Sequence, residues 1–223
     1  MKKIFILAMV LLGVTAPVAQ ALVLPPEVDA TIFDGLQWGF DGVPDYINDD
    51  EYPQALYSSK YNFETRGFFE FNLSTVASGF NSAVFSGTVD ASKGPYPFTV
   101  DVYGYSGDGV ISTGDYQAGD FLTSFQYDEE GEVFVDLTPF MADMIADGNP
   151  YAGLNFRMRY AAGDERELIY LAFNSLSYPP SAVMTFDYGA AAVPEPATLL
   201  LTALGLSGLG VWQGRRKSFL RKE

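Results

Sequence analysis

The sequence predicts an all-β fold: a single jelly-roll-like antiparallel β-sandwich with one short helix, flanked by an N-terminal signal helix and a C-terminal transmembrane helix. Apolar and polar residues alternate with a period of two in several short segments, most clearly over residues 154–160. Gly, Pro, Asn and Asp separate these segments, as turns between strands require. The roughly 170 residues between the terminal segments suit one domain with a core large enough to need no disulfide.

The N-terminus has the three parts of an export signal. Lys2 and Lys3 are followed by an apolar run over residues 4–14, and an Ala-x-Ala cleavage site is formed by Ala19 and Ala21. Residues 1–21 are therefore predicted to be a signal peptide that signal peptidase removes. An uncleaved anchor is the alternative.

The central segments follow the strand pattern, with one exception. The expected strands include residues 68–73, 98–102, 154–160, 169–173 and 184–188. One short helix is predicted to interrupt this run of strands, with Thr138 as N-cap and Pro139 as its first residue. Phe140, Met141, Met144 and Ile145 then share one face, and Gly148 is the expected stop.

Composition excludes several classes of site. The chain contains no His and no Cys, which excludes Ser-His-Asp and Cys-His catalysis and His-ligated zinc. Between the two terminal segments, residues 22–192 hold six basic and 26 acidic residues, a net charge of −20. Such a surface repels phosphate backbones, so nucleic acid is not an expected partner.

Two groups of carboxylates are candidate calcium ligands. Asp108 and Asp115 belong to a Gly- and Asp-rich segment that resembles part of an EF-hand-like loop, and Asp45 and Asp49 belong to an acidic stretch. The alternatives are an inter-strand turn for the first pair and a solvated loop for the second. Calcium is therefore the one cofactor that the sequence suggests.

Aromatic residues in the same acidic stretch suggest a ligand surface. Trp38, Tyr46 and Tyr52 are interleaved with Asp and Asn, a mixture that suits the apolar faces and hydroxyls of sugars. Most of the 18 Phe and 14 Tyr residues must nevertheless fill the core.

The C-terminus combines three features in a fixed order. Pro194, Glu195 and Pro196 precede an apolar span over about residues 197–213, and Arg215, Arg216 and Lys217 follow it. The basic cluster would stay cytoplasmic by the positive-inside rule. This arrangement resembles the PEP-CTERM sorting signal, which implies recognition and processing by an exosortase. A permanent tail anchor is the alternative.

The central domain also resembles a known family. Residues 66–74, 133–138, 151–154 and 179–188 are similar in order and character to segments of DNRLRE-type domains, which are jelly-roll sandwiches among the carbohydrate-binding-module-like folds. The resemblance rests on core and turn residues. It implies a fold and an association with surface polysaccharide, and it assigns no catalytic residue.

These observations predict four parts: the signal peptide (1–21), the β-sandwich domain (22–188), a linker (189–193) and the sorting tail (194–223). The expected protein is exported, held transiently in the inner membrane, and delivered to the cell surface or the exopolysaccharide matrix. It is expected to be carbohydrate-associated and not an enzyme, with signal peptidase, exosortase and exopolysaccharide as partners. A polysaccharide-acting enzyme using Asp or Glu, and a passive structural adhesin, are the alternatives.

Overall fold

The structure is a computed structural model and describes residues 19–35, 41–49, 52–58, 63–93, 97–128, 131–159, 169–177 and 179–190. Two compact units are distinguished: residues 21–189, and a unit of residues 1–20 with 190–223. Nearly all of the described residues belong to the first unit. The predicted signal peptide (apart from its last residues) and the sorting tail lie outside the described residues.

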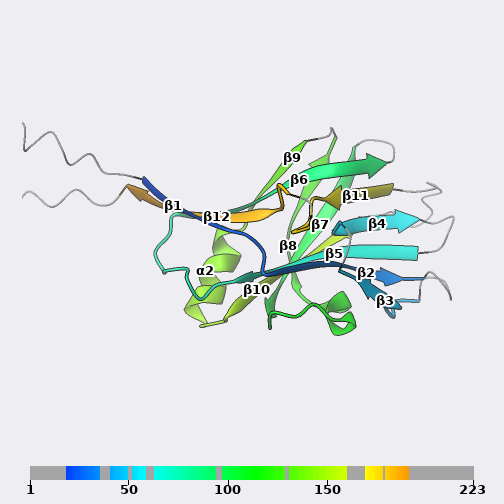
Figure 1. Cartoon of the computed structure of the whole chain (residues 1–223), viewed down its shortest axis with the longest axis horizontal. Helices are drawn as coiled ribbons and strands as arrows, with labels where there is room; N and C mark the ends of the chain where they lie inside the picture. Colours follow the sequence, from blue (N-terminus) through cyan, green and yellow to red (C-terminus); the bar gives the residue numbers. More distant parts are fainter. Residues whose placement is uncertain are drawn as a thin grey trace, which may run out of the picture. The chain divides into compact units, whose positions relative to one another are not determined.

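The described residues form a 12-stranded fold with one α-helix, α2 (Thr138–Ala146), and one 3-10 helix, η1 (Thr113–Gln117) (Figure 1). The strands are β1 (Ala19–Leu24), β2 (Val28–Asp34), β3 (Tyr46–Asn48), β4 (Gln54–Ser58), β5 (Phe63–Asn72), β6 (Ser82–Lys93), β7 (Phe98–Gly107), β8 (Asp120–Tyr127), β9 (Glu132–Asp136), β10 (Tyr151–Met158), β11 (Ile169–Phe173) and β12 (Val183–Ala190). The predicted all-β class with one short helix is confirmed for this part of the chain. The jelly-roll connectivity stays a prediction.

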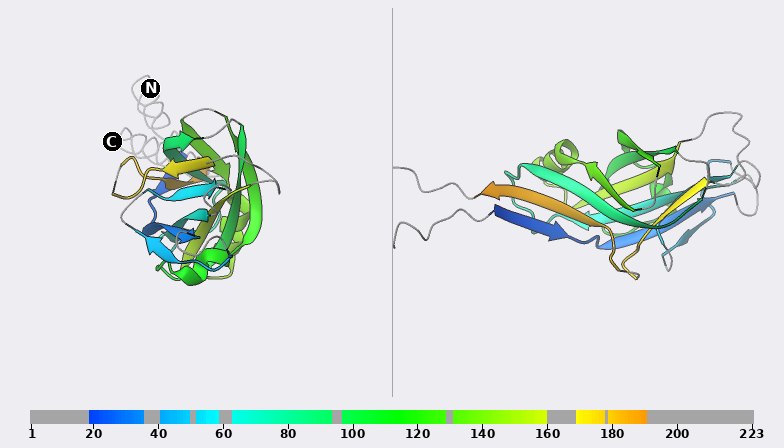
Figure 2. Two further views of the ribbon diagram at one scale, coloured as in Figure 1. Left: turned by 90° about the vertical axis from the view of Figure 1, so that its right-hand side faces the viewer. Right: turned by 90° about the horizontal axis from the view of Figure 1, so that it is seen from above.

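The strands are hydrogen-bonded in the order β1-β12-β6-β11-β4-β5-β10-β7-β8. Strand β2 pairs with β5 and β3, and β9 pairs with β6. The long strand β6 connects two groups of strands. Its first half pairs with β12 and β9, and its second half pairs with β11, which leads on to β4, β5, β10, β7 and β8. Strands β1 and β12 lie side by side (Figure 2). Since β1 begins at Ala19, the predicted cleavage position after Ala21 falls within a strand of the uncleaved chain, and cleavage stays a prediction.

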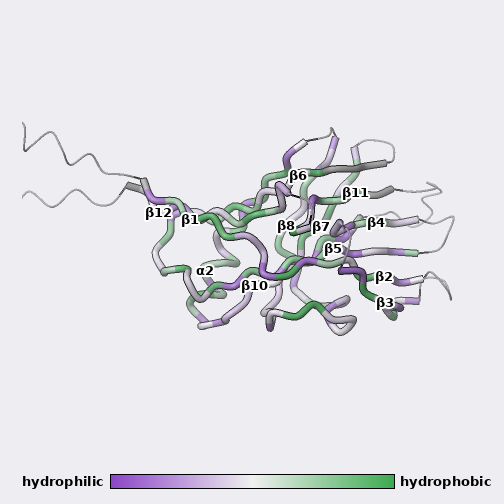
Figure 3. The backbone as a smooth tube through the Cα atoms, in the orientation of Figure 1, coloured by the Kyte–Doolittle hydropathy of each residue, from purple (hydrophilic) through white to green (hydrophobic). Residues whose placement is uncertain are grey.

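Aromatic side chains join the two groups of strands in one core. Phe85 of β6 lies 5.4 Å from Phe69 of β5 and 5.0 Å from Phe156 of β10, measured between ring centroids, and all three are fully buried. Hydrophilic and hydrophobic residues are mixed along the strands (Figure 3), and on β6 the buried Ala83, Phe85 and Val89 alternate with half-buried residues, as a strand with one face in the core requires. Each ring buried in this way stabilises the fold by about 1.5–3 kcal/mol relative to exposure.

The predicted strands are confirmed where the structure describes them. Each overlaps an observed strand, and Leu154, Phe156 and Met158 of β10 all point into the core. Strand β5 differs from the expected one-sided pattern, because residues 64–71 are all buried. Its second face is therefore covered by another part of the chain.

The start of helix α2 corrects the predicted cap. Leu137 is the N-cap, and Thr138 is the first helical residue. The Thr138 hydroxyl is engaged elsewhere: it donates to Asp136 Oδ1 at 2.6 Å and accepts from the Ala83 N–H at 2.9 Å, so it ties the helix to β9 and β6. The predicted stop is confirmed, since Gly148 has φ +73° and its N–H donates to the Ile145 carbonyl.

Candidate functional site

The predicted aromatic surface is only partly described. Tyr46 is 40% exposed and stacks flat on Phe33 of β2, with ring centroids 4.5 Å apart and 6° between the planes. Tyr52 is half-buried, and its carbonyl oxygen accepts a hydrogen bond from Thr31 Oγ1 at 3.0 Å. Trp38 lies outside the described residues. A ligand surface formed by Trp38, Tyr46 and Tyr52 therefore stays a prediction.

The predicted calcium ligands Asp108 and Asp115 each stabilise a local turn. Asp108 Oδ1 accepts a hydrogen bond from the Val110 N–H at 3.0 Å. Asp115 Oδ2 accepts from the Ser112 N–H at 2.7 Å and from the Ser112 hydroxyl at 2.9 Å, at the start of η1. These are the bonds that Asp typically makes in turns.

The second predicted pair, Asp45 and Asp49, flanks strand β3. Asp45 Oδ2 accepts a hydrogen bond from the Gly35 N–H at 2.8 Å, whereas Asp49 is exposed beyond the end of β3. Within the part of the chain that the structure describes, no group of three or more Asp or Glu residues is placed to hold a metal ion. Calcium binding stays a prediction.

Residues 108–119, which we call the strap, cover the second face of β5. The strap leaves β7, forms η1 and enters β8. It encloses a second, smaller core, formed by the buried residues Ile32, Phe68, Tyr105 and Tyr116, with Ile47, Ile111 and Ala118 packed against them. The strap explains why both faces of β5 are buried.

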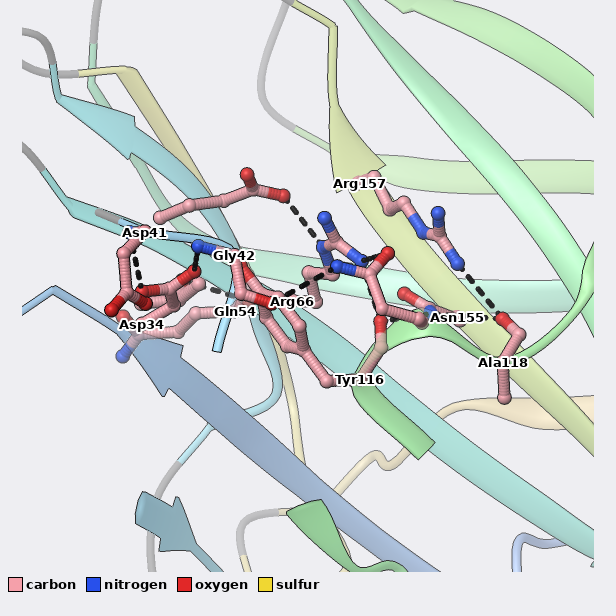
Figure 4. Close-up of polar contacts among 12 residues, drawn as sticks. Asp34, Asp41, Gly42, Gln54, Arg66, Tyr116, Ala118, Asn155 and Arg157 are labelled. Carbon is pink, nitrogen blue, oxygen red and sulfur yellow. Dashed lines mark hydrogen bonds and ion pairs between the residues drawn. The ribbon is translucent and has the colours of Figure 1, made fainter. Parts of the chain in front are cut away.

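Arg66 of β5 contacts the strap at Tyr116 (Figure 4). Its Nε donates to Glu64 Oε1 at 2.6 Å, and one terminal nitrogen donates to the Tyr116 carbonyl oxygen. The guanidinium also lies 3.8 Å from the centre of the Tyr116 ring. Burial raises the pKa of Glu64, and the Arg66 charge opposes that rise. This ion pair is buried together with its hydrogen-bond partners, which limits the desolvation cost.

Strand β10 supplies two further donors to the strap (Figure 4). Asn155 Nδ2 donates to the carbonyl oxygens of Tyr116 at 3.3 Å and Ala118 at 3.2 Å. Arg157 donates to the same Ala118 carbonyl at 2.8 Å. Side chains of the sheet thus satisfy backbone carbonyls of a loop that would otherwise be buried without partners.

Glu70 holds the other end of the strap. Its Oε2 accepts a hydrogen bond from the Gly109 N–H at 2.7 Å, and the side chain is fully buried. Burial raises the pKa of Glu70, and the Gly109 bond opposes the rise. Because Glu64 and Glu70 are both covered, neither is open to a substrate in this structure.

Beside the strap, a row of side chains with half-buried Tyr103 and Arg157 and exposed Phe121 crosses three strands. The Arg157 guanidinium of β10 lies 3.7 Å from the centre of the Tyr103 ring of β7. Tyr103 in turn meets Phe121 of β8 edge to face, with centroids 5.8 Å apart. Phe121 is 53% exposed. Burial lowers the pKa of Arg157 to about 10, with the nearby Arg66 charge as the next cause.

A charged pair continues this row. Arg159 donates to both carboxylate oxygens of Asp101, with Nε at 3.0 Å from Oδ2. We call Tyr103, Phe121, Arg157 and the Asp101–Arg159 pair the aromatic face. The sequence analysis did not select it. One signal was available: Asn155, Arg157 and Arg159 alternate on the clearest predicted strand and so share its outer side.

The comparisons with known proteins concern the end of the chain. Residues 192–217 match the PEP-CTERM protein-sorting motif. No curated protein matches the chain. The motif includes Pro194, Glu195, Pro196 and the basic cluster, all of which lie outside the described residues.

The sorting motif bears on the export and processing of the protein. It supports export, a transient stay in the membrane and processing by an exosortase. Among the described residues, no helix is long and apolar enough to cross a membrane, and the predicted span at 197–213 lies outside them. The match covers the tail alone and assigns no activity to the central domain.

Proposed function

We propose that the central domain, residues 22–188, is a non-catalytic, carbohydrate-associated component of the cell surface or of the exopolysaccharide matrix. It contacts sugars through the aromatic face. The observation that carries this proposal is the exposed Phe121 ring beside Tyr103 and a bidentate Asp–Arg pair. This role fits a protein that the sorting motif directs out of the cell.

The chemistry of the aromatic face suits a sugar ring. A pyranose has apolar C–H faces and a rim of hydroxyl groups, so it needs an aromatic surface with polar groups at its edge. Phe121 and Tyr103 provide the surface, and Asp101 and Arg159 provide acceptors and donors. Asp101, Tyr103 and Phe121 lie on the paired strands β7 and β8, and Arg159, directly after β10, bonds to Thr99 of β7 through its backbone N–H, so the spacing of the four side chains is fixed before a ligand arrives.

A non-catalytic role fits the buried carboxylates. A glycosidase needs two carboxyl groups that flank the scissile bond. Glu64 and Glu70 have pKa values raised by burial, but the strap covers both of them. They contribute to holding the strap, so they are not available as an acid and base pair for a bound sugar.

A glycan array tests the proposal with the full-length chain purified in detergent. We expect retention of specific glycans and a loss of about tenfold in affinity for Phe121→Ala, since a central aromatic contact is typically worth more than 1 kcal/mol. Phe134→Ala is the matched control: Phe134 is 63% exposed on β9, a strand that pairs with β6 and, among the described residues, with no strand of the aromatic face. The Phe134→Ala variant should bind the retained glycans with the affinity of the wild type.

The other outcomes identify other functions. If no glycan is retained, the carbohydrate proposal fails and a structural adhesin becomes the better description. If oligosaccharides appear that are shorter than those supplied, the protein is an enzyme. Repeating the array in calcium and in chelator tests whether the acidic turns at Asp45, Asp49, Asp108 and Asp115 take part.

A further inference from the structure

The aromatic face has a net positive charge, although the domain that carries it is strongly acidic. Over residues 22–192 the net charge is −20. Among the described residues that share this side of strands β7, β8 and β10, those with charged side chains are Asp101, Arg157 and Arg159. One negative and two positive side chains give this side of the sheet a local charge of +1.

The neighbours of Phe121 on β8 add no negative charge to this side. Ser124 and Gln126 lie on the same side of the strand as Phe121, and both are exposed and uncharged. Asp120 is paired with Gly104 and points to the other side of the sheet. At an ionic strength of about 0.15 M, charges more than about 8 Å away are largely screened, so the acidic residues elsewhere in the domain act weakly on a ligand here.

Arg157 has no counter-ion because its cross-strand neighbour is bonded elsewhere. In the pairing of β10 with β7, Arg157 is directly opposite Asp101, a position in which opposite charges attract each other. Both carboxylate oxygens of Asp101 instead accept hydrogen bonds from Arg159, with Nε at 3.0 Å from Oδ2. Within the described part of the chain, no carboxylate forms an ion pair with Arg157.

The Arg157 guanidinium is held in place with one terminal nitrogen left over. The other terminal nitrogen donates to the Ala118 carbonyl at 2.8 Å (Figure 4), and the guanidinium lies 3.7 Å from the centre of the Tyr103 ring. The remaining terminal nitrogen makes no hydrogen bond to the described residues and is reached by solvent. Burial and then the Arg66 charge lower the pKa of Arg157 to about 10. A ligand carboxylate would supply the missing acceptor and the missing negative charge.

Building on the proposed function, on which this step rests, we propose that the aromatic face selects oligosaccharides that contain hexuronate residues, and that Arg157 binds their carboxylate. A hexuronate carries its carboxylate directly on the pyranose ring. One residue of such a chain offers its apolar C–H face to Phe121, and a neighbouring residue offers its carboxylate to Arg157. The planar guanidinium suits this group, because it donates to a carboxylate in a fixed plane and as an ion.

Paired oligosaccharides test this selection with the full-length chain in a non-ionic detergent. The probes are short oligomers of galacturonate, glucuronate and mannuronate, each compared by calorimetry with the same oligomer after reduction of its carboxylates to hydroxymethyl groups. We expect an acid form to bind about tenfold more tightly than its reduced form, since a hydrogen bond to a charged group typically provides such a difference. Equal or tighter binding of the reduced forms would overturn the selection and leave the proposed function standing. If neither form binds, the selection fails, and the glycan array described above decides the proposed function separately.

Single replacements locate the effect at Arg157. Arg157→Gln should abolish the preference for the acid form, while the reduced form binds within about twofold of its affinity for the wild type. A preference for the acid form that persists in Arg157→Gln would overturn the role of this residue.

A second variant should gain affinity, which a loss of folding cannot produce. Asp101→Asn removes the negative charge from this side of the sheet and should strengthen binding of the acid form about threefold. Asp143→Asn removes the same charge from the exposed side of helix α2 and should leave the affinity unchanged. Equal strengthening by the two variants would mean general repulsion by the acidic domain and would overturn the proposal.

Discussion

Asp29 is a carboxylate whose burial opposes its ionisation. Its pKa rises from 3.8 to about 6, mainly through desolvation, and the Leu176 N–H bond only partly offsets that rise. Because the folded pKa lies above the unfolded one, Asp29 contributes most to stability below about pH 4 and this contribution is lost as the pH rises through 6. A shift of this size corresponds to about 2–3 kcal/mol.

Asp29→Asn should therefore stabilise the protein at high pH. Asn cannot ionise, and its side-chain oxygen still accepts the Leu176 bond. We expect the stability of the variant relative to wild type to rise by about 2 kcal/mol between about pH 4 and pH 8. Urea denaturation at a series of pH values measures this difference.

The control for this prediction is an exposed carboxylate. Asp143→Asn, on the exposed side of helix α2, removes the same charge from the surface, and its stability is measured over the same pH series. An equal pH dependence in the two variants would contradict the assignment of a raised pKa to Asp29.

Residue type alone did not locate the candidate site. Asp45, Asp108 and Asp115 are predicted as ligands because their chemistry suits calcium, and in the structure each accepts a hydrogen bond from a different backbone N–H, a contact that residue type does not predict. Tyr103 and Phe121 become neighbours only through the register of β7 and β8, which shifts at a bulge between Val102 and Tyr103. A sequence pattern gives the side of a strand on which a residue lies and gives no inter-strand register.

The strap depends on a close approach between two backbone segments. Gly119, at its end, has φ +100°, and a Cβ there would lie 2.9 Å from the Gly104 carbonyl oxygen. Since the obstructing atom belongs to the backbone of β7, it cannot move as a side chain would. We expect Gly119→Ala to destabilise the fold by about 3 kcal/mol, measured by urea denaturation.

Gly79→Ala separates the two causes. Gly79 has a similar φ of +90° with nothing within 4 Å of a Cβ, so its replacement should cost about 1 kcal/mol through backbone strain alone. The difference between the two variants is the cost of the close approach at Gly104. If the two losses are equal, the strap has no steric requirement for glycine at position 119.

The elements that could be predicted are those with a local cause. Alternation in β10 and the glycine at the end of α2 depend on neighbouring residues, and both were predicted correctly. The burial of Glu64 and Arg66 has no local cause, because the strap that covers them is about 50 residues away in the sequence. Thr138 failed as a cap for the same reason: its hydroxyl is taken by Ala83 of β6.

The acidic surface of the whole domain should make its stability depend on salt. A net charge of −20 over residues 22–192 places many like charges within a Debye length of one another. Raising NaCl from about 0.05 M to about 0.5 M should raise the melting temperature by about 2–4 °C, which corresponds to about 1 kcal/mol. Replacing Asp143 and Asp147 with Lys should reduce this dependence, and a larger rise in that variant would contradict self-repulsion as its cause.

The sorting motif supports export of the chain and its processing by an exosortase. Pro194, Glu195 and Pro196 lie within the matched residues, so they are the part that an exosortase is expected to read. Replacing all three residues with Ala removes both proline rings and the charge. We expect most of the variant to stay at full length in the inner-membrane fraction, whereas the wild type is shortened and released, as measured by fractionation and intact mass.

Pro150→Ala, at an exposed turn before β10, is the control and should be processed normally. Normal processing of the triple variant would show that the exosortase reads the apolar span and basic cluster without the Pro-Glu-Pro segment.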